Sequence, residues 1–456
     1  MLRVTQPQLS LWDAVIPPHL VQLNDELAKV DQLLDDADVL APFIKRFSCR
    51  MGRPTVPVDT FLRLMYLKFR YQLGYETLVG EVNDSLMWRR FCRIPLDEKV
   101  PDATTLIKLR KKYGAVVDEV NRLVIDRARE RRVVRGKKLR VDTTVVPSDI
   151  HYPTDAGQLA DGVRLITRVA RRIQQAGIAA SAVFRDRSRS IKKRILAITK
   201  VVKRRTGEAW NDVRAITGEI IEIAKESVSD AHRVLATTRE KLRRTPERVT
   251  EQILNQAKRL NHYVTLTEQI IKQAERVQQG ERSIPGRIVS LFDPKARPIR
   301  KGKLNAPTEF GRKVMIQETE ERVITHYRVL DGNPPDTGLL ISAVDQHTQM
   351  FHEPPQEVAA DRGFFSAEGE KALYERGVHR VSIPKPGRLS PSRREQQRQH
   401  WFRRLQRFRA GGEATISLYK RKFGGSRSRF RDPGGTEAWV GWGIMAYNLR
   451  RLAQLS

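Results

Sequence analysis

The sequence is poor in cysteine. Cys49 and Cys92 are the only two cysteines among its 456 residues. Two cysteines are too few for a zinc knuckle, and a disulfide framework would need more of them. We therefore expect both to be small, buried, apolar side chains in a protein of a reducing compartment.

Long hydrophobic runs are also missing from the sequence. No stretch approaches the roughly 18 consecutive apolar residues of a membrane-spanning helix. The first 20 residues lack the unbroken apolar segment of a secretory signal peptide. These absences predict a cytoplasmic protein with no membrane partner.

Acidic residues are few relative to basic ones. The chain contains 53 Asp and Glu against 84 Lys and Arg, which gives a formal charge of +31. Such an excess repels itself in a compact state unless a polyanion binds to it. Nucleic acid is the expected partner. The charge alone does not separate DNA from RNA, and it leaves open a merely basic soluble protein.

The chain is long enough for more than one domain. Residues 1–115 carry the patterns of several short helices, the last of them after Pro101. That helix would turn its apolar residues inward and spread four basic residues over its exposed side: Lys108, Arg110, Lys111 and Lys112. This favours an all-helical, helix-turn-helix-like DNA-binding domain, whose last helix can enter the major groove. A helical cap with solvated lysines is the alternative.

Three further segments with different residue patterns follow this region. Residues 136–150 contain KLRVDTTVV, which is rich in β-branched residues and typical of a central strand. Residues 155–285 have apolar residues spaced by three and four, as in packed or coiled-coil helices. We interpret them as a helical insertion, for which dimerisation, DNA clamping and a spacer role all remain open. Residues 300–456 alternate strands with helices and predict an α/β fold with a mixed sheet.

Three carboxylates have settings that suggest chemistry. Asp142 lies inside the apolar strand, where an unpaired acid is costly unless it binds a cation or a hydrogen-bond donor. Asp361 ends a second apolar strand, before a glycine that permits a sharp turn. Glu413 is expected in the first turn of a helix, where an acid is favourable in any case. A buried hydrogen bond, a turn residue and a surface glutamate are the respective alternatives.

Several segments of the chain resemble the DDE transposases of bacterial insertion sequences. GRPTVPVDTFLRLMYLKFRYQLGYETLVGEV, residues 52–82, is similar to the InsH-type N-terminal domain of that family. VDTTVV around Asp142 and VAADRGFFS around Asp361 resemble the first and second catalytic blocks. Arg409, Glu413 and Lys420 match the spacing of the third block, in which Gln406 stands where the family has tyrosine.

The resemblance implies an RNase H-like catalytic core in residues 136–150 and 300–456, interrupted by the helical insertion. Asp142, Asp361 and Glu413 would be the catalytic triad and would ligate two Mg²⁺ (or Mn²⁺) ions. Arg409 and Lys420 would bind DNA phosphates.

The implied protein cleaves DNA at the ends of an insertion sequence and joins them to a target. Its partners would be double-stranded DNA, as terminal inverted repeats and target, and a second copy in a homodimer on DNA. Its place would be the bacterial cytoplasm, at the nucleoid. A catalytically decayed DNA-binding regulator and an RNase H-like nuclease without strand transfer remain open.

Overall fold

The computed structural model describes residues 3–4, 15–45, 55–114, 116–204, 206–242, 247–281, 283–300, 308–431 and 434–455. The chain forms two compact units, one of residues 1–149 with 312–456 and one of residues 150–311. Cys92 is buried, as expected, whereas Cys49 lies outside the described residues. No described helix combines the length and the apolar character needed to cross a membrane.

Helices dominate the N-terminal part of the first unit. Their starts follow local capping rules: Asn24 accepts a hydrogen bond from the Leu27 amide, and Asp102 accepts one from the Thr104 amide. The elements are η1 (Pro18–Leu20), α2 (Asp25–Leu34), α3 (Ala37–Ile44), α4 (Val58–Arg70), α5 (Tyr75–Asp84), α6 (Leu86–Phe91), α7 (Ala103–Tyr113) and α8 (Val116–Glu130).

These helices do not form a separate compact unit ending at residue 115. Their buried side chains belong to one apolar cluster that also contains residues from β-strands and from the last helix, α17 (Gly435–Leu455). Phe61 packs edge-on against Trp442 of α17, with ring centroids 5.6 Å apart. The predicted N-terminal region is therefore helical, and its core is continuous with that of the sheet.

A mixed sheet occupies the rest of the first unit. Its strands are β1 (Lys138–Pro147), β3 (Thr308–Thr319), β4 (Ile324–Val329), β5 (Glu357–Ala360) and β6 (Arg380–Ser382). β4 pairs antiparallel with β3, β3 lies beside β1, and β1, β5 and β6 are parallel neighbours. The mixed α/β fold predicted from the sequence is confirmed.

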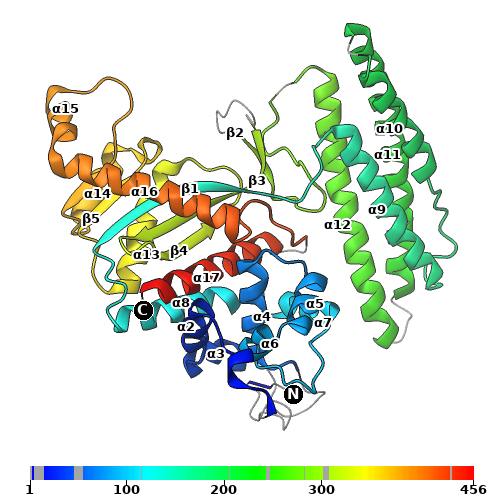
Figure 1. Cartoon of the computed structure of the whole chain (residues 1–456). Helices are drawn as coiled ribbons and strands as arrows, with labels where there is room; N and C mark the ends of the chain where they lie inside the picture. The colour runs from blue at the N-terminus through cyan, green and yellow to red at the C-terminus, as the bar shows by residue number, and fades with distance from the viewer. Residues whose placement is uncertain are drawn as a thin grey trace. The chain divides into compact units, whose positions relative to one another are not determined.

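Helices cover both faces of this sheet (Figure 1). On one face, Leu139 and Val141 pack in a cluster with α13 (Leu339–Phe351) and α14 (Ala367–Glu375). On the other, α16 (His400–Lys422) packs against β1, β5 and β6. The remaining short elements are η2 (Asp336–Gly338), η3 (Arg362–Phe364) and α15 (Pro391–Arg398).

The second unit contains the predicted helical insertion. Its helices are α9 (Asp155–Gln175), α10 (Ser188–Val202), α11 (Gly207–Leu242) and α12 (Glu247–Gln278). β2 (Arg297–Arg300) pairs antiparallel with the first residues of β3, from Thr308 to Gly311. An apolar cluster of its own, including Leu159, Ile220 and Leu260, holds the helices together.

Candidate active site

Asp142 and Asp361 occupy adjacent positions of two neighbouring strands. The parallel register of β1 and β5 pairs Arg140 with Ala359 and Val141 with Ala360. Asp142 directly follows Val141, and Asp361 directly follows Ala360, so both aspartates come just after the last pair of the register. Neighbouring strands lie about 4.8 Å apart, and paired residues in register point to the same face. The two backbone positions are therefore next to each other at one edge of the sheet.

Each aspartate also has a local backbone contact. Asp142 Oδ1 accepts a hydrogen bond from the Thr143 amide at 2.7 Å. Asp361 Oδ1 accepts one from the Gly363 amide at 3.2 Å, and Ser366 caps α14 just beyond it. The turn expected after β5 is confirmed, and the Asp361 side chain is exposed there.

Glu413 lies in the second half of α16, not in the first turn of a helix. The structure corrects this expectation, because the basic segment before Glu413 is itself helical. Ser390 caps α15, and the extended backbone of Gln399 separates it from α16, which begins at His400. A charge near the middle of a helix gains little from the helix dipole, whose effect is confined to the terminal turns.

Arg409 pairs with Glu413 and lines a pocket with Asp142. Its guanidinium donates a hydrogen bond to Glu413 Oε1 at 3.1 Å, one helical turn away. Arg409 and Gly412 also line a small pocket together with Asp142. The Glu413 side chain is 66% exposed, so its carboxylate has room to move. α16 thus presents Arg409 and Glu413 beside the strand that carries Asp142.

A buried ion pair fixes α16 over the sheet. Arg140, two residues before Asp142, donates through Nε to Glu318 Oε2 at 2.8 Å and through Nη2 to Glu318 Oε1. Its Nη1 donates to the Phe408 carbonyl of α16 at 2.6 Å, and Thr415 Oγ1 donates to Glu318 Oε1 at 2.6 Å. Burial raises the pKa of the Glu318 carboxyl, and the bonds from Arg140 and Thr415 oppose that rise.

Gln406, where the family has tyrosine, provides a second connection. Its Nε2 donates to the Ser382 carbonyl at 2.8 Å and contacts the Ser382 hydroxyl at 3.0 Å. The same nitrogen lies 3.5 Å from the Ala360 carbonyl, directly before Asp361. Gln406 therefore ties α16 to the ends of β5 and β6.

The carboxylates suit a hard divalent ion by donor type. Mg²⁺ and Mn²⁺ prefer oxygen ligands, and all three candidates supply carboxylate oxygens. Within the part of the chain that the structure describes, no three Asp, Glu, His or Cys side chains are already grouped to hold a metal ion. The structure places the two aspartates next to each other on β1 and β5 and Glu413 on the helix that packs against both strands, and within the described residues their side chains are not joined into a ligand set.

The predicted DNA-binding residues have different environments. Lys108, Lys111 and Lys112 are exposed on α7, as expected. Arg110 is buried, which corrects its expected place on the exposed side, and its guanidinium lies 4.0 Å from the centroid of the Phe430 ring. A cation over an aromatic face is stabilised by the ring quadrupole. Lys420 is half-buried near the end of α16.

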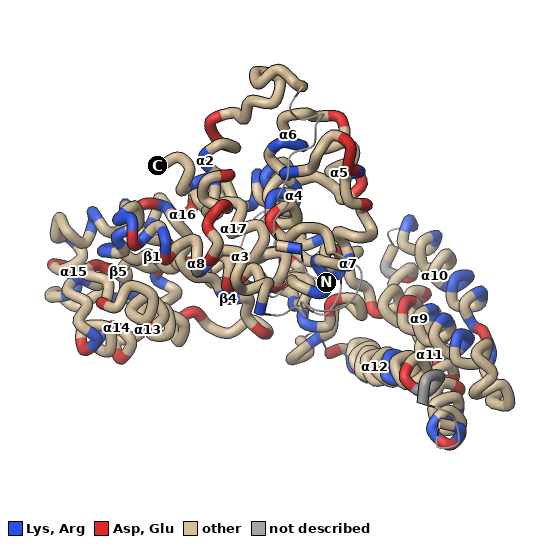
Figure 2. The backbone as a smooth tube through the Cα atoms, turned by 90° about the horizontal axis from the view of Figure 1, so that it is seen from below, with Lys and Arg blue, Asp and Glu red and all other residues tan. Residues whose placement is uncertain are grey.

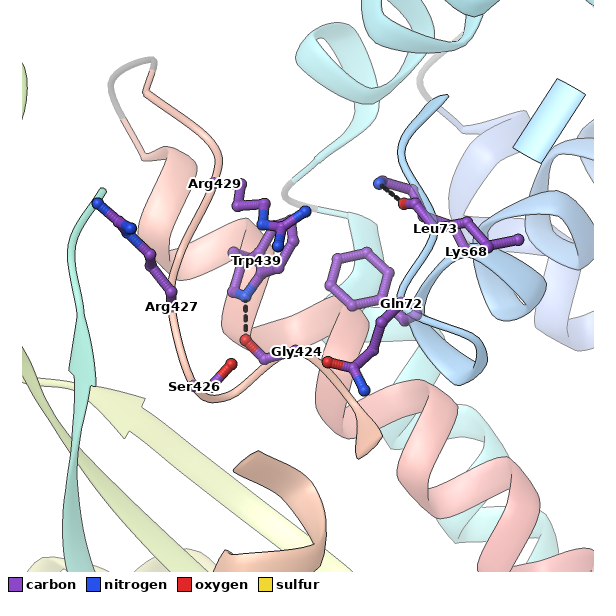
Figure 3. Close-up of a pocket in the computed structure, with 9 residues that line it drawn as sticks. Lys68, Gln72, Leu73, Gly424, Ser426, Arg427, Arg429 and Trp439 are labelled. Carbon is purple, nitrogen blue, oxygen red and sulfur yellow. Dashed lines mark hydrogen bonds between the residues drawn. The ribbon is translucent and has the colours of Figure 1, made fainter. Parts of the chain in front are cut away.

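A second polar pocket lies between the end of α4 and the loop after α16 (Figure 3). Lys68 donates to the Leu73 carbonyl at 2.6 Å, and Trp439 donates to the Gly424 carbonyl at 2.7 Å. Burial, with the charges of Arg429 and Arg110, lowers the pKa of Lys68 to about 8. The residues lining this pocket include no carboxylate, so it does not suit a metal ion.

Sequence reasoning missed Arg140, Glu318 and Gln406 as supports of the site. A signal existed for the first two, because each places a charge inside an apolar strand, as Asp142 does. Their partnership joins residues 178 positions apart, and a single sequence does not indicate which distant charge completes such a pair.

Comparisons with known families give matches in two regions of the chain. Residues 18–112 match the family described as Transposase domain (DUF772), and residues 284–449 match the family described as Transposase DDE domain. The chain is 28% identical over 128 residues to "Uncharacterized protein ORF8 in nfe locus" of Rhizobium meliloti. That similarity covers 27% of this chain and 62% of the relative, so the chain spans less than two thirds of it. No solved structure matches the chain significantly.

The two family matches lie on either side of the insertion helices in the sequence. The first falls on the N-terminal helices, and the second includes both Asp361 and Glu413. The two matches identify the N-terminal helices and the second half of the chain as transposase domains, as expected for a DDE transposase of insertion sequences.

Proposed function

We propose that this protein binds the ends of an insertion sequence and catalyses metal-dependent DNA cleavage and strand transfer through Asp142, Asp361 and Glu413. The observation that carries the proposal is the register of β1 and β5, which puts the two aspartates side by side. The packing of α16 against the same two strands supports Glu413 as the third member.

The strand order supports an RNase H-like core. β4, β3, β1, β5 and β6 are consecutive neighbours, with the parallel strands on one side of β1 and the antiparallel β3–β4 pair on the other. The candidate acids then lie on the central strand, at the end of the adjacent parallel strand and on the helix covering both. Such an arrangement places oxygen ligands from three separate elements around one edge of the sheet.

The three carboxylates would hold two Mg²⁺ or Mn²⁺ ions. When bound, such a pair of ions supplies activation of the attacking oxygen and stabilisation of the leaving oxygen. Arg409 offsets the negative charge of Glu413 when no ion is present. In the complex with DNA, Arg409 and Lys420 would bind phosphate oxygens, the usual targets of these side chains.

Double-stranded DNA is the proposed partner, both as terminal inverted repeats and as target. The charge of +31 supports binding to a polyanion. The exposed Lys108, Lys111 and Lys112 of α7 would contribute to it. A homodimer on DNA at the bacterial nucleoid remains part of the proposal by family resemblance.

The proposal is tested with DNA that carries the sequences flanking the gene, incubated with a target plasmid and Mg²⁺. We expect cleavage at the element's ends and joining of the freed 3′-hydroxyl to the plasmid. Asp142→Asn, Asp361→Asn and Glu413→Gln should each abolish both steps and leave DNA binding intact. Glu395→Gln, which changes an exposed acid on α15, is the matched control and should keep full activity.

Each alternative predicts a different result. A nuclease without strand transfer would cleave the DNA and give no joined product. A catalytically decayed regulator would bind the DNA and neither cut nor join it. Full cleavage by Glu413→Gln would remove Glu413 from the site and require another acid.

A further inference from the structure

The helical unit contains a segment with charge of one sign. Residues 187–205, which include α10, hold nine Lys and Arg and no Asp or Glu. The neighbouring α11 holds seven acidic and five basic residues, so it does not share this excess. Figure 2 shows the basic residues repeated along α10.

Three of these cations form ion pairs inside the unit, among them Arg204, which lies 3.7 Å from Asp212 of α11. Arg187 pairs with Glu226 and Asp230 of α11, and Arg194 pairs with Glu219 at 2.6 Å. The apolar side chain of Ile191 is buried in the same interface. These contacts fix which face of α10 packs against the unit and which face is turned outward.

The outward face is a row of cations. At 100° per residue, the side chains of Lys192, Lys193, Lys200 and Lys203 fall within an arc of about 100°. We call these four residues the α10 lysine row. All four are exposed. Among the described residues, none of them forms an ion pair or a side-chain hydrogen bond, so their charges are available to a partner.

We propose that the α10 lysine row binds the sugar-phosphate backbone of double-stranded DNA. The row and Arg189 extend over roughly 20 Å at a rise of 1.5 Å per residue. DNA presents a negative charge about every 1.7 Å along its axis, so several phosphates fall within that length. The inference rests on the proposed function only in taking DNA as the polyanion.

The chemistry of the row favours phosphates over other partners. Lysine is a point charge without the planar fork with which arginine reads guanine, so we expect binding independent of sequence. Leu196 is 53% exposed at the centre of the row, but the main apolar face of α10 is buried in the unit. A membrane surface would require that apolar face to be free. This assigns the helical insertion a role as a DNA-holding element.

The test uses the full chain with all four lysines of the row changed to glutamine. Affinity for a random 30-base-pair duplex and for an element-end duplex is measured by fluorescence anisotropy over a range of NaCl concentrations. We expect both duplexes to bind more weakly, with the slope of log affinity against log salt reduced by roughly 3 to 4, because each phosphate that the protein no longer neutralises lowers the slope by about 0.9. Thermal denaturation checks that the variant is folded.

The matched control changes Arg214, Lys258, Arg259 and Lys272 to glutamine, four exposed cations without an ion pair among the described residues. It removes the same charge from α11 and α12 of the same unit and should leave the slope nearly unchanged. If the two variants gave equal slopes of log affinity against log salt, the α10 assignment would be wrong, because the loss of affinity would then depend only on the net charge of the protein. A row variant that binds both duplexes like wild type would also overturn it, and would leave an acidic protein surface as the partner to test. Failure of the wild-type chain to bind any DNA would instead contradict the proposed function.

Discussion

Arg140 and Glu318 form a buried two-point ion pair directly beneath the candidate active site. Their side chains are only 5% and 3% exposed. The guanidinium lies on the same strand as Asp142 and also bonds to α16, which carries Glu413. This charged network therefore holds the helix against β1, two residues before Asp142 along the strand.

Removing one partner of this pair should be strongly destabilising. Arg140→Met leaves the Glu318 carboxylate buried without its cation, and Glu318→Met leaves the guanidinium without its anion. Loss of one partner of a buried pair costs about 3–5 kcal/mol. We expect both single variants to lose about that much free energy of unfolding, measured by urea denaturation. The double variant Arg140→Met/Glu318→Met should lose less than either. Losses that simply add would show that the two side chains do not depend on each other.

The two glycines before Glu413 allow the approach of Arg140 to α16. A Cβ at Gly411 would lie 2.9 Å from Arg140 Nη1, and a Cβ at Gly412 would lie 3.2 Å from Nε. Gly411→Ala should therefore destabilise the protein by about 1–3 kcal/mol, the usual cost of overpacking. Gly80→Ala is the matched control, since Gly80 also lies inside a helix but has open space around it. That change should stabilise the protein by about 0.5–1 kcal/mol. Stabilisation of both variants in thermal denaturation would contradict the close approach.

Gln406 should affect catalysis through geometry, because it bonds to Ser382 and approaches the carbonyl before Asp361. Gln406→Leu removes the donor, and we expect end cleavage to fall by tenfold or more, on the order of 1.4 kcal/mol in the barrier. DNA affinity should not change. Gln406→Tyr restores a donor at the position where the family has tyrosine and should recover part of the rate. Equal rates for the leucine and tyrosine variants would argue against a positioning role.

The sequence is informative where local chemistry decides the structure. The β-branched run from Lys138 predicts β1, which the structure gives as Lys138–Pro147. Gly363 and Ser366 predict the turn and the helix cap after Asp361, and both are present. At these positions the backbone preferences of neighbouring residues are sufficient, so no distant contact is needed.

The incorrect predictions occur where contacts between residues far apart in the sequence determine the structure. Arg110 has the sequence setting of a surface residue on a basic helix, but it packs over Phe430, more than 300 residues away. The residue pattern predicts that α16 begins later than it does, because a densely charged segment is typical of a loop. In the structure the segment is helical and packs against the sheet. Phe402 and Leu405 are buried against it and stabilise the added turns.

His347 should make stability depend on pH. Its Nε2 contacts the Gly136 carbonyl at 2.8 Å, and its ring stacks on Phe351 with centroids 4.4 Å apart. Burial lowers the pKa of His347 to about 4 from an ordinary value of 6.5. Between these values the unfolded chain binds a proton that the folded chain excludes. The contribution of His347 to stability is therefore complete above pH 6.5 and is lost as the pH falls toward 4.

The expected loss is about 3 kcal/mol between pH 7 and pH 4, at 1.36 kcal/mol for each pKa unit. We predict that His347→Gln is less stable than wild type at pH 7, because the stacked and hydrogen-bonded ring is gone. Glutamine does not titrate in this range, so the difference between the two proteins should shrink as the pH falls. Urea denaturation at pH 7, 6, 5 and 4 measures this difference directly. A difference that stays constant across the series would mean that His347 takes up its proton equally in the folded and unfolded chains, which the burial of its ring opposes.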